Sequence, residues 1–250
     1  MMGLLIRLAG PLQSWGEHSV FTHRDTLRYP TRSGIIGIFA AAEGRPRGEP
    51  LSDYDALRLT VRIDRPGIVV RDFHTVGGGY PREATVPTAE GKRRTPETAT
   101  IVTHRHYLTD AVFTVAVEGP EDRTRAIAEA LDSPHWPVFL GRRSCPPDQP
   151  LLLRSDVDDP VDHLNRRVPI AYRPRRKDEP SELDFVTEGA LDNAESVAEL
   201  TDVPQTFARL DRRFRTRTVS VTSRSVPESL WSTGTAAYYD ALIDYIKEAR

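Results

Sequence analysis

The sequence predicts an α+β fold, because its apolar segments alternate between the periods of strands and helices. Residues 4–8 form a short apolar run that suits a buried strand, and residues 33–43 have the apolar spacing of a helix. Two strands, an interruption, another strand and a second helix follow along the chain. This succession is close to the βαββαβ order of ferredoxin-like and RRM-type domains.

The first half of the chain supplies most of these elements. The first helix ends at Gly44, and Pro46 follows it, which is a common way for a helix to stop. Apolar and polar residues then alternate over residues 57–64, the period of a half-buried strand, and a second strand is expected at residues 68–73. Residues 77–100 interrupt the pattern with a polar segment rich in threonine, proline and arginine.

Regular patterns return after this insertion. Alternation over residues 101–117 predicts a strand, and residues 121–131 predict a helix with acidic residues near its start and one apolar face. Beyond Ser155 the chain is mostly charged and irregular. The remaining expected elements are short strands at residues 138–140, 151–153 and 214–221 and a terminal helix at residues 238–248.

Composition indicates a globular protein with a sizeable core. The chain has 250 residues, of which 38% are hydrophobic and 28% charged, enough for one large domain or a domain with a smaller companion. No apolar run approaches the roughly 18 residues of a membrane span, and residues 1–8 lack the pattern of a signal peptide. The single cysteine, Cys145, excludes an internal disulfide and suits a reducing cytoplasm, where we expect the protein to act.

Several catalytic and metal-binding motifs are absent from the sequence. It contains no P-loop, no G-x-G-x-x-G after a strand, no paired C-x-x-C and no G-x-S-x-G around a serine. His104 and His106 would share one face of a strand and could bind a metal with a third ligand, but no cysteine or carboxylate motif accompanies them. Cys145 follows two arginines that could lower its pKa, yet a buried small residue is the simpler interpretation. We therefore expect no metal and no cofactor.

The start of the first helix carries residues suited to phosphate binding. A helix N-terminus presents unpaired N–H groups and a partial positive charge. Arg32 can contact a phosphate with two N–H groups, Gly34 allows a ligand to come close, and the nearby Trp15 can stack on a base. The alternative is an ordinary capped helix with Trp15 in the core.

Basic residues are concentrated in four local clusters. Because the formal net charge is only −2, any attraction to nucleic acid must come from such clusters rather than from the whole protein. Together with the RRM-like element order they favour RNA, although each could also be a solvated surface. The sequence lacks the aromatic motif with which RRM sheets read RNA, so we expect loops and helix ends to bind it. The clusters are residues 92–94, 141–146, 166–177 and 209–217.

Five segments, in this order, resemble the motifs of one family. The family is CasD, the Cas-five-type subunit of the type I-E CRISPR surveillance complex Cascade, within the RAMP superfamily. The motifs extend over roughly residues 3–147, and the rest of the chain matches only loosely. The segments are residues 8–16, 30–37, 72–76, 107–115 and 140–146.

This resemblance implies a modified ferredoxin-like fold with a β-hairpin thumb. Residues 1–147 would form the RAMP domain, and the insertion at about residues 77–104 would be the thumb. Residues 148–250 would complete the fold as a small C-terminal extension that faces partner proteins.

The resemblance also implies a function in antiviral defence. The protein would be a non-catalytic ribonucleoprotein subunit that binds and caps the 5′ handle of the CRISPR RNA. It would lie beside the backbone and large subunits of Cascade, and it would meet target DNA only indirectly, through the complex. The alternative, from the type I-C branch, is a metal-independent endoribonuclease, for which residues 104–107 supply His, Arg and Tyr side chains. A third hypothesis is an assembly subunit that contacts no RNA.

The resemblance further implies which residues contact RNA. Residues at the first helix start would bind handle phosphates, and those of the segment before it would line the same pocket. Residues on the strand that returns from the thumb would clamp or stack on nucleotides, and the arginine pair after residue 140 would close the site. The implied RNA-binding residues are Gln13, Trp15, Arg32, Ser33, Gly34, Arg105, Tyr107, Arg142 and Arg143, and Lys92 and Arg93 of the thumb would face spacer RNA or the adjacent subunit.

Overall fold

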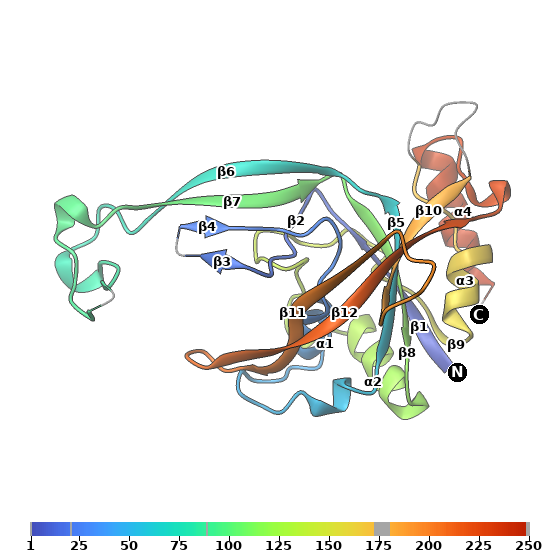
Figure 1. Ribbon diagram of the computed structural model, residues 1–250, viewed down its shortest axis with the longest axis horizontal. Helices are drawn as coiled ribbons and strands as arrows, with labels where there is room; N and C mark the ends of the chain where they lie inside the picture. The colour runs from blue at the N-terminus through green and yellow to red at the C-terminus, as the bar shows by residue number, and fades with distance from the viewer. Residues whose placement is uncertain (1, 21, 89, 173–180, 249–250) are drawn as a thin grey trace.

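A computed structural model describes residues 2–20, 22–88, 90–172 and 181–248 of the chain. The molecule contains an antiparallel sheet and a second, mixed sheet in which β4 and β7 are parallel, and a long hairpin of the second sheet projects far from the body (Figure 1). The large sheet has the strand order β11-β12-β10-β5-β8-β1-β9. Its strands are β1 (Met2–Ala9), β5 (Arg58–Arg65), β8 (Val112–Glu118), β9 (Leu152–Asp158), β10 (Glu182–Glu188), β11 (Ser196–Phe207) and β12 (Arg212–Ser225).

The centre of the large sheet follows the order that the sequence predicts. Strand β1 leads into helix α1, strands β5 and β8 follow, and helix α2 connects them to β9. In space these strands lie in the order β5-β8-β1-β9, and every neighbouring pair is antiparallel. The helices of the molecule are α1 (Arg32–Ala42), α2 (Glu121–Asp132), α3 (Pro160–Arg166) and α4 (Thr235–Lys247).

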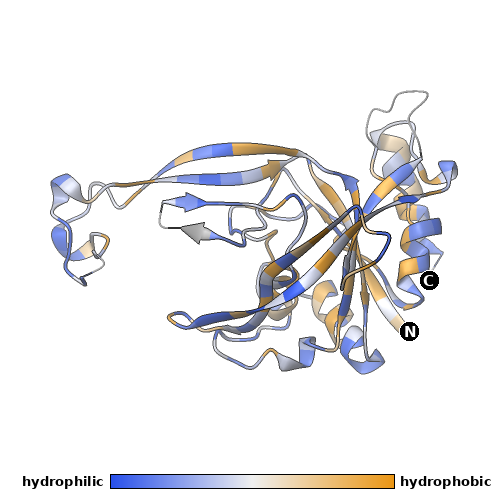
Figure 2. Ribbon diagram, viewed as in Figure 1, coloured by the Kyte–Doolittle hydropathy of each residue, from blue (hydrophilic) through white to orange (hydrophobic). Residues whose placement is uncertain are grey.

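Helices cover both faces of this sheet, because the side chains of each strand alternate between two apolar cores. On β1, Leu4, Ile6 and Leu8 join the core that includes α1 and α2. The intervening Leu5 and Ala9 join the core that includes α3 and α4. Figure 2 shows the central strands largely in hydrophobic colours, as burial on both faces requires. In the part of the chain that the structure describes, no helix is long and apolar enough to cross a membrane.

The second sheet contains the insertion. Its strands are β2 (Leu12–Gln13), β3 (Ser19–Val20), β4 (His23–Arg24), β6 (Ile68–Val76) and β7 (Ile101–Thr109). Strands β6 and β7 form a regular hairpin whose tip carries the short 3₁₀ helices η2 (Arg82–Ala84) and η3 (Pro96–Thr98). The prediction of a single strand over residues 101–117 is wrong, because this segment forms the two strands β7 and β8. Asp110, with a φ of 58°, turns the chain between β7 and β8, and aspartate tolerates this left-handed conformation better than most residues.

The second half of the chain is more regular than its charged composition indicates. The sequence prediction misses α3, β10 and β11, and the strand expected at residues 214–221 is the middle of the longer β12. Charged residues obscure the pattern because much of β11 and β12 is exposed. No strand forms over residues 138–140, since the Leu140 backbone bonds to Ser14 and Cys145 in loops instead. The remaining prediction there, a terminal helix, is confirmed by α4.

A buried ion pair lies within β5, and its arginine connects this strand to α3 and the segment after it. The side chains of Arg62 and Asp64 are fully buried, and the Arg62 Nε atom lies 2.5 Å from the Asp64 Oδ1 atom. Arg62 also donates to the carbonyl oxygens of Leu164, Val168 and Pro169. Every polar group of this cluster is thereby satisfied without water, which is the condition under which a buried charge is tolerated.

Replacement of Asp64 by asparagine should lower the free energy of unfolding by about 3–5 kcal/mol, because it leaves the Arg62 charge buried without its partner. Urea unfolding followed by circular dichroism measures this loss. Asp55→Asn is the matched control, since it breaks the exposed pair with Arg215 and should cost about 1 kcal/mol or less. Equal losses in the two variants would contradict the assigned role.

Candidate nucleic-acid interface

A groove of about 580 Å³ runs along helix α1 between the β11–β12 hairpin and the loops after β1 and α2. Among the described residues that line it, none is an aspartate or a glutamate. The lining combines positive charge with aromatic rings, two properties that suit phosphates and unpaired bases. Its arginines are Arg24, Arg45, Arg47, Arg142, Arg143 and Arg212, and its rings are those of Trp136, Phe139, Phe207 and Phe214.

The floor of the groove is the N-terminal half of α1 and its small side chains. Thr31 caps the helix by accepting a hydrogen bond from the Gly34 N–H at 3.2 Å. Ser33, Gly34 and Gly37 line the groove, and no acidic residue lies in the first turn. The Asp202 carboxylate, outside the groove lining, accepts a hydrogen bond from the Arg32 backbone N–H and compensates the positive end of the helix, so the attraction of the groove for an anion comes from its arginines.

Trp15 and Gln13 lie beneath this floor. Both side chains are fully buried, and the Trp15 indole N–H donates to the Gln13 Oε1 atom at 3.0 Å. Gln13 in turn donates to the carbonyl oxygens of Leu8 and Ala111. The Trp15 ring is so close that a Cβ atom at Gly34 would lie 2.7 Å from it. Burial thus corrects the expectation that Trp15 stacks on a base, and we assign both residues a supporting role.

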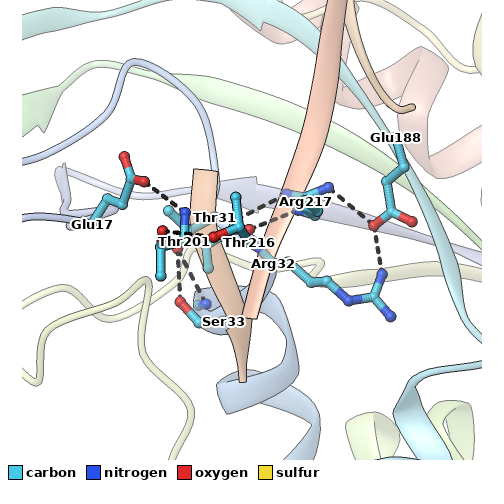
Figure 3. A network of polar contacts seen from close by, with 10 residues as sticks. Glu17, Thr31, Arg32, Ser33, Glu188, Thr201, Thr216 and Arg217 are labelled. Carbon is cyan, nitrogen blue, oxygen red and sulfur yellow. Dashed lines mark hydrogen bonds and ion pairs between the residues drawn. The ribbon is translucent and has the colours of Figure 1, made fainter. Parts of the chain in front are cut away.

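Arg32 is also turned away from the groove. Its side chain is 5% exposed, and the guanidinium donates to the Glu188 Oε1 atom at 2.5 Å and to the Tyr54 carbonyl oxygen at 2.8 Å (Figure 3). Its backbone N–H donates to the Asp202 Oδ2 atom at 2.6 Å. The expectation that Arg32 binds a phosphate is therefore wrong, because its guanidinium donates to groups inside the protein. We assign Arg32 a structural role.

The same carboxylates hold Arg217 of β12. Arg217 donates to both oxygens of Asp202, at 2.7 and 2.9 Å, and to the Glu188 Oε1 atom at 3.0 Å. Burial alone would lower the pKa of Arg217, but the hydrogen bonds and charges of Asp202 and Glu188 raise it above its usual value. These four residues, Arg32, Glu188, Asp202 and Arg217, form the α1–hairpin clamp, which fixes the β11–β12 hairpin against the start of α1.

Arg142 and Tyr107 close one end of the groove. The Arg142 guanidinium lies over the Tyr107 ring, 4.7 Å from its centre, and donates to the carbonyl oxygens of His106 and Arg24. This stacked arrangement leaves Tyr107 only 6% exposed, so Arg142 rather than the ring borders the groove. The neighbouring Arg143 is exposed, and in the described structure its side chain has no hydrogen bond or ion pair.

The other implied residues lie outside the groove. Arg105, on β7, donates to Thr103 in its own strand and does not line the groove. Lys92 and Arg93 lie in the loop at the tip of the β6–β7 hairpin, which Figure 1 shows far from α1. Arg93 donates to the Thr85 carbonyl oxygen and thereby ties this loop together. The structure therefore brings only Ser33, Gly34, Arg142 and Arg143 of the implied set to one surface.

Sequence reasoning missed most of the residues that line the groove. Arg212 belongs to the basic cluster at residues 209–217, but nothing in the spacing of that cluster predicts that it lies opposite α1. The rings come from separate loops and strands, so no local motif identifies them. Arg45 is paired with Glu43 and Asp53, which reduces its attraction for anions. Among the described residues, the groove arginines whose side chains have no hydrogen bond or ion pair are Arg24, Arg47, Arg143 and Arg212.

The geometry of β7 separates the candidate nuclease residues. Successive side chains of a strand point to opposite faces, so His104 and His106 lie on one face and Arg105 and Tyr107 on the other. His104 packs between the rings of His23 and Phe73, with ring centres 5.4 and 5.7 Å away. These four residues therefore do not converge on one substrate position. Among the described residues, no group of three metal-ligating side chains occurs.

Cys145 is a small buried residue, as the simpler interpretation of the sequence holds. Its side chain is fully buried in the core that includes α1 and α2. Burial raises the pKa of the Cys145 thiol, and the hydrogen bond from Ser144 and the nearby Arg142 only partly oppose this effect. The thiol therefore stays protonated at neutral pH.

Comparison with known proteins agrees with the family resemblance. The family described as CRISPR-associated protein (Cas_Cas5) matches residues 3–220. The CRISPR system Cascade subunit CasD of Escherichia coli (strain K12) is 36% identical over 182 residues, which cover 67% of this chain and 77% of the relative. A chain of a solved CRISPR RNA-guided surveillance complex is 51% identical, with a TM-score of 0.87 over 98% of this chain and 99% of that one. A chain from a crystal structure of a Cas protein is 31% identical, with a TM-score of 0.60 over 93% of this chain and 98% of that one.

Two glycines of α1 provide a test of the groove floor. Gly34→Ala should lower the free energy of unfolding by about 1–3 kcal/mol, because the added methyl group overlaps the buried Trp15 ring. Gly37→Ala is the matched control, since a Cβ atom there meets nothing within 4 Å. It should raise stability by roughly 0.5–1 kcal/mol, as alanine in place of glycine favours a helix. Thermal unfolding of both variants measures these opposite changes in stability. A Gly34→Ala protein as stable as wild type would contradict the packing described.

Proposed function

Because this chain belongs to the Cas5 family of CRISPR-associated proteins, we propose that it is a non-catalytic type I-E Cascade subunit that binds the 5′ handle of the CRISPR RNA. The observation that carries the proposal is the groove along α1, with its arginines and no lining carboxylate. Its relatives are a Cascade subunit and a chain of an RNA-guided surveillance complex, which supports the same function.

The groove offers two kinds of contact to an RNA backbone. Arginine donates two parallel hydrogen bonds to a phosphate, and Arg47, Arg143 and Arg212 are free to do so from different sides of the groove. The hydroxyl group of Ser33, which lines the groove, adds a neutral hydrogen-bond donor. The α1–hairpin clamp neutralises the buried arginines internally, so the free arginines are left for the RNA. A backbone held in this way caps one end of the guide without reading its sequence.

The fold supports further proposals about assembly. The β5-β8-β1-β9 strands with α1 and α2 correspond to the ferredoxin-like core of a RAMP protein, and the β6–β7 hairpin corresponds to its thumb. Exposed apolar side chains on this hairpin, such as Ile68 and Tyr80, suit contact with the neighbouring backbone subunit. The large subunit would dock on the C-terminal part, and target DNA would be met only through the assembled complex in the cytoplasm.

Incubation of the purified chain with labelled repeat RNA, without metal, tests the proposed function. Native gels should show a complex with RNA that contains the 5′-handle sequence, and denaturing gels should show intact RNA. Cleavage at the handle boundary that is lost in His104→Ala would support the endoribonuclease instead. Absence of any complex, both alone and within reconstituted Cascade, would support a subunit that contacts no RNA.

The Arg143→Ala variant tests the charge of the groove. Loss of one charge-assisted hydrogen bond should weaken handle binding by about 1.5–3 kcal/mol. The slope of log affinity against log salt should flatten by about 0.7, the value for one phosphate of a single strand. Arg58→Ala is the matched control, because Arg58 is also exposed but lies at the start of β5 outside the groove. Identical slopes for the two variants would argue against an RNA contact at Arg143.

A further inference from the structure

Phosphate binding does not account for the aromatic walls of the groove. Trp136 keeps 40% of its surface exposed, although a large ring gains most from burial. Phe207 and Phe214 of the β11–β12 hairpin are also left partly exposed where they border the groove. A ligand that covers these rings would remove apolar surface from water, so the walls point to flat apolar groups as well as to charge.

The loop after α2 holds Trp136 in place. The Trp136 N–H donates to the Ala41 carbonyl oxygen at 3.2 Å, and the His135 N–H donates to that of Ala42 at 2.8 Å. The Trp136 ring also packs edge-on against the His135 ring, with centres 5.1 Å apart. The backbone bonds fix the loop to the C-terminal end of α1, and the His135 ring packs beside the indole, while the helix start lies at the other end of the groove. A ring fixed in advance loses little freedom when a ligand stacks on it.

The opposite wall is held by strand pairing and by the α1–hairpin clamp. Phe207 pairs with Arg212 across the two strands, and Arg212 and Phe214 are two residues apart on β12. All three therefore project from the same face of the hairpin, and all three border the groove. The clamp residues Asp202 and Arg217 lie further along the same strands and fix this face relative to α1.

We propose that the groove stacks unpaired bases of the bound RNA on Trp136 and Phe214, while Arg212 holds a phosphate between them. The inference rests on the proposed function and deepens it, because it assigns base contacts to a groove that was argued from charge alone. Arginines next to rings match the alternation of phosphate and base along a single strand. Every base has a flat face, so these contacts tolerate different sequences. Gly37, with open space above it, leaves room for a base to enter.

Abasic RNA separates stacking from a merely structural role of the rings. The set of probes is the repeat RNA with one base removed at each handle position in turn. Trp136→Ala and Phe214→Ala should each weaken binding of the intact RNA by about 5- to 150-fold. For each ring there should be one abasic RNA that wild type and variant bind equally, since the stacked base is already missing. Trp136→Phe should recover much of the affinity, because a ring remains.

Ile243→Ala serves as the control for exposed apolar surface. Ile243 is 43% exposed, close to the value for Trp136, but it lies on α4 on the other side of the large sheet. Binding by this variant should equal that of wild type. Circular dichroism of each variant at the assay temperature establishes that it is folded.

The outcomes distinguish this inference from the function on which it rests. Failure of the wild-type chain to bind handle RNA, alone and within Cascade, would reject both. Salt-dependent binding that is unchanged in Trp136→Ala and Phe214→Ala would reject base stacking and leave the phosphate groove in place. Equal losses with every abasic RNA would also overturn the inference, because the rings would then act on structure alone. Binding of a poly-glutamate peptide as tightly as handle RNA would also overturn the inference, because it would show that the groove binds anions in general.

Discussion

The groove depends on the α1–hairpin clamp, a buried set of two arginines and two carboxylates. Asp202, at 1% exposure, accepts hydrogen bonds from both arginines, including the first backbone N–H of α1. It thereby joins a helix start near the beginning of the chain to a hairpin near its end. Removal of one partner would leave buried charge without compensation, a severe cost. The clamp therefore acts together with the apolar core, in which Leu200 and Val219 of the hairpin join residues of α1, to hold the hairpin opposite the helix.

The clamp also explains how a protein with a net charge of −2 can present a positive groove. Glu188 and Asp202 form ion pairs with Arg32 and Arg217 inside the protein. Glu43 and Asp53 form ion pairs with Arg45 at the edge of the groove. Acids are thus placed away from the groove surface, while arginines such as Arg143 remain there unpaired. Local arrangement, and not overall composition, sets the electrostatic character of this surface.

Apolar patterns in the sequence were sufficient for the core up to α2, because β1 is buried along nearly its whole length and β5 and α1 carry apolar residues at the spacing of a strand and of a helix. It failed for β10 and β11, where exposure breaks the alternation, and at Asp110, where one residue reverses the chain, and it found only the middle of β12. For the groove, the helix start and the Arg142–Arg143 pair were identifiable from local motifs. The inward orientation of Arg32 was not, since its carboxylate partners Glu188 and Asp202 lie more than 150 residues away in sequence and only the tertiary structure brings them together.

The junction between the projecting hairpin and the body has a mechanical consequence. Strand β5 continues into β6 after a turn at Gly67, whose φ is +70°, and β7 continues into β8 through Asp110. A side chain at Gly67 would meet the Thr109 carbonyl oxygen at 2.6 Å, and the Arg65–Asp110 ion pair spans the same junction. The hairpin is thus a lever arm rooted in the two central strands of the large sheet. A force on its tip is therefore transmitted to strands that are hydrogen-bonded on both sides, rather than to an edge strand with one neighbour.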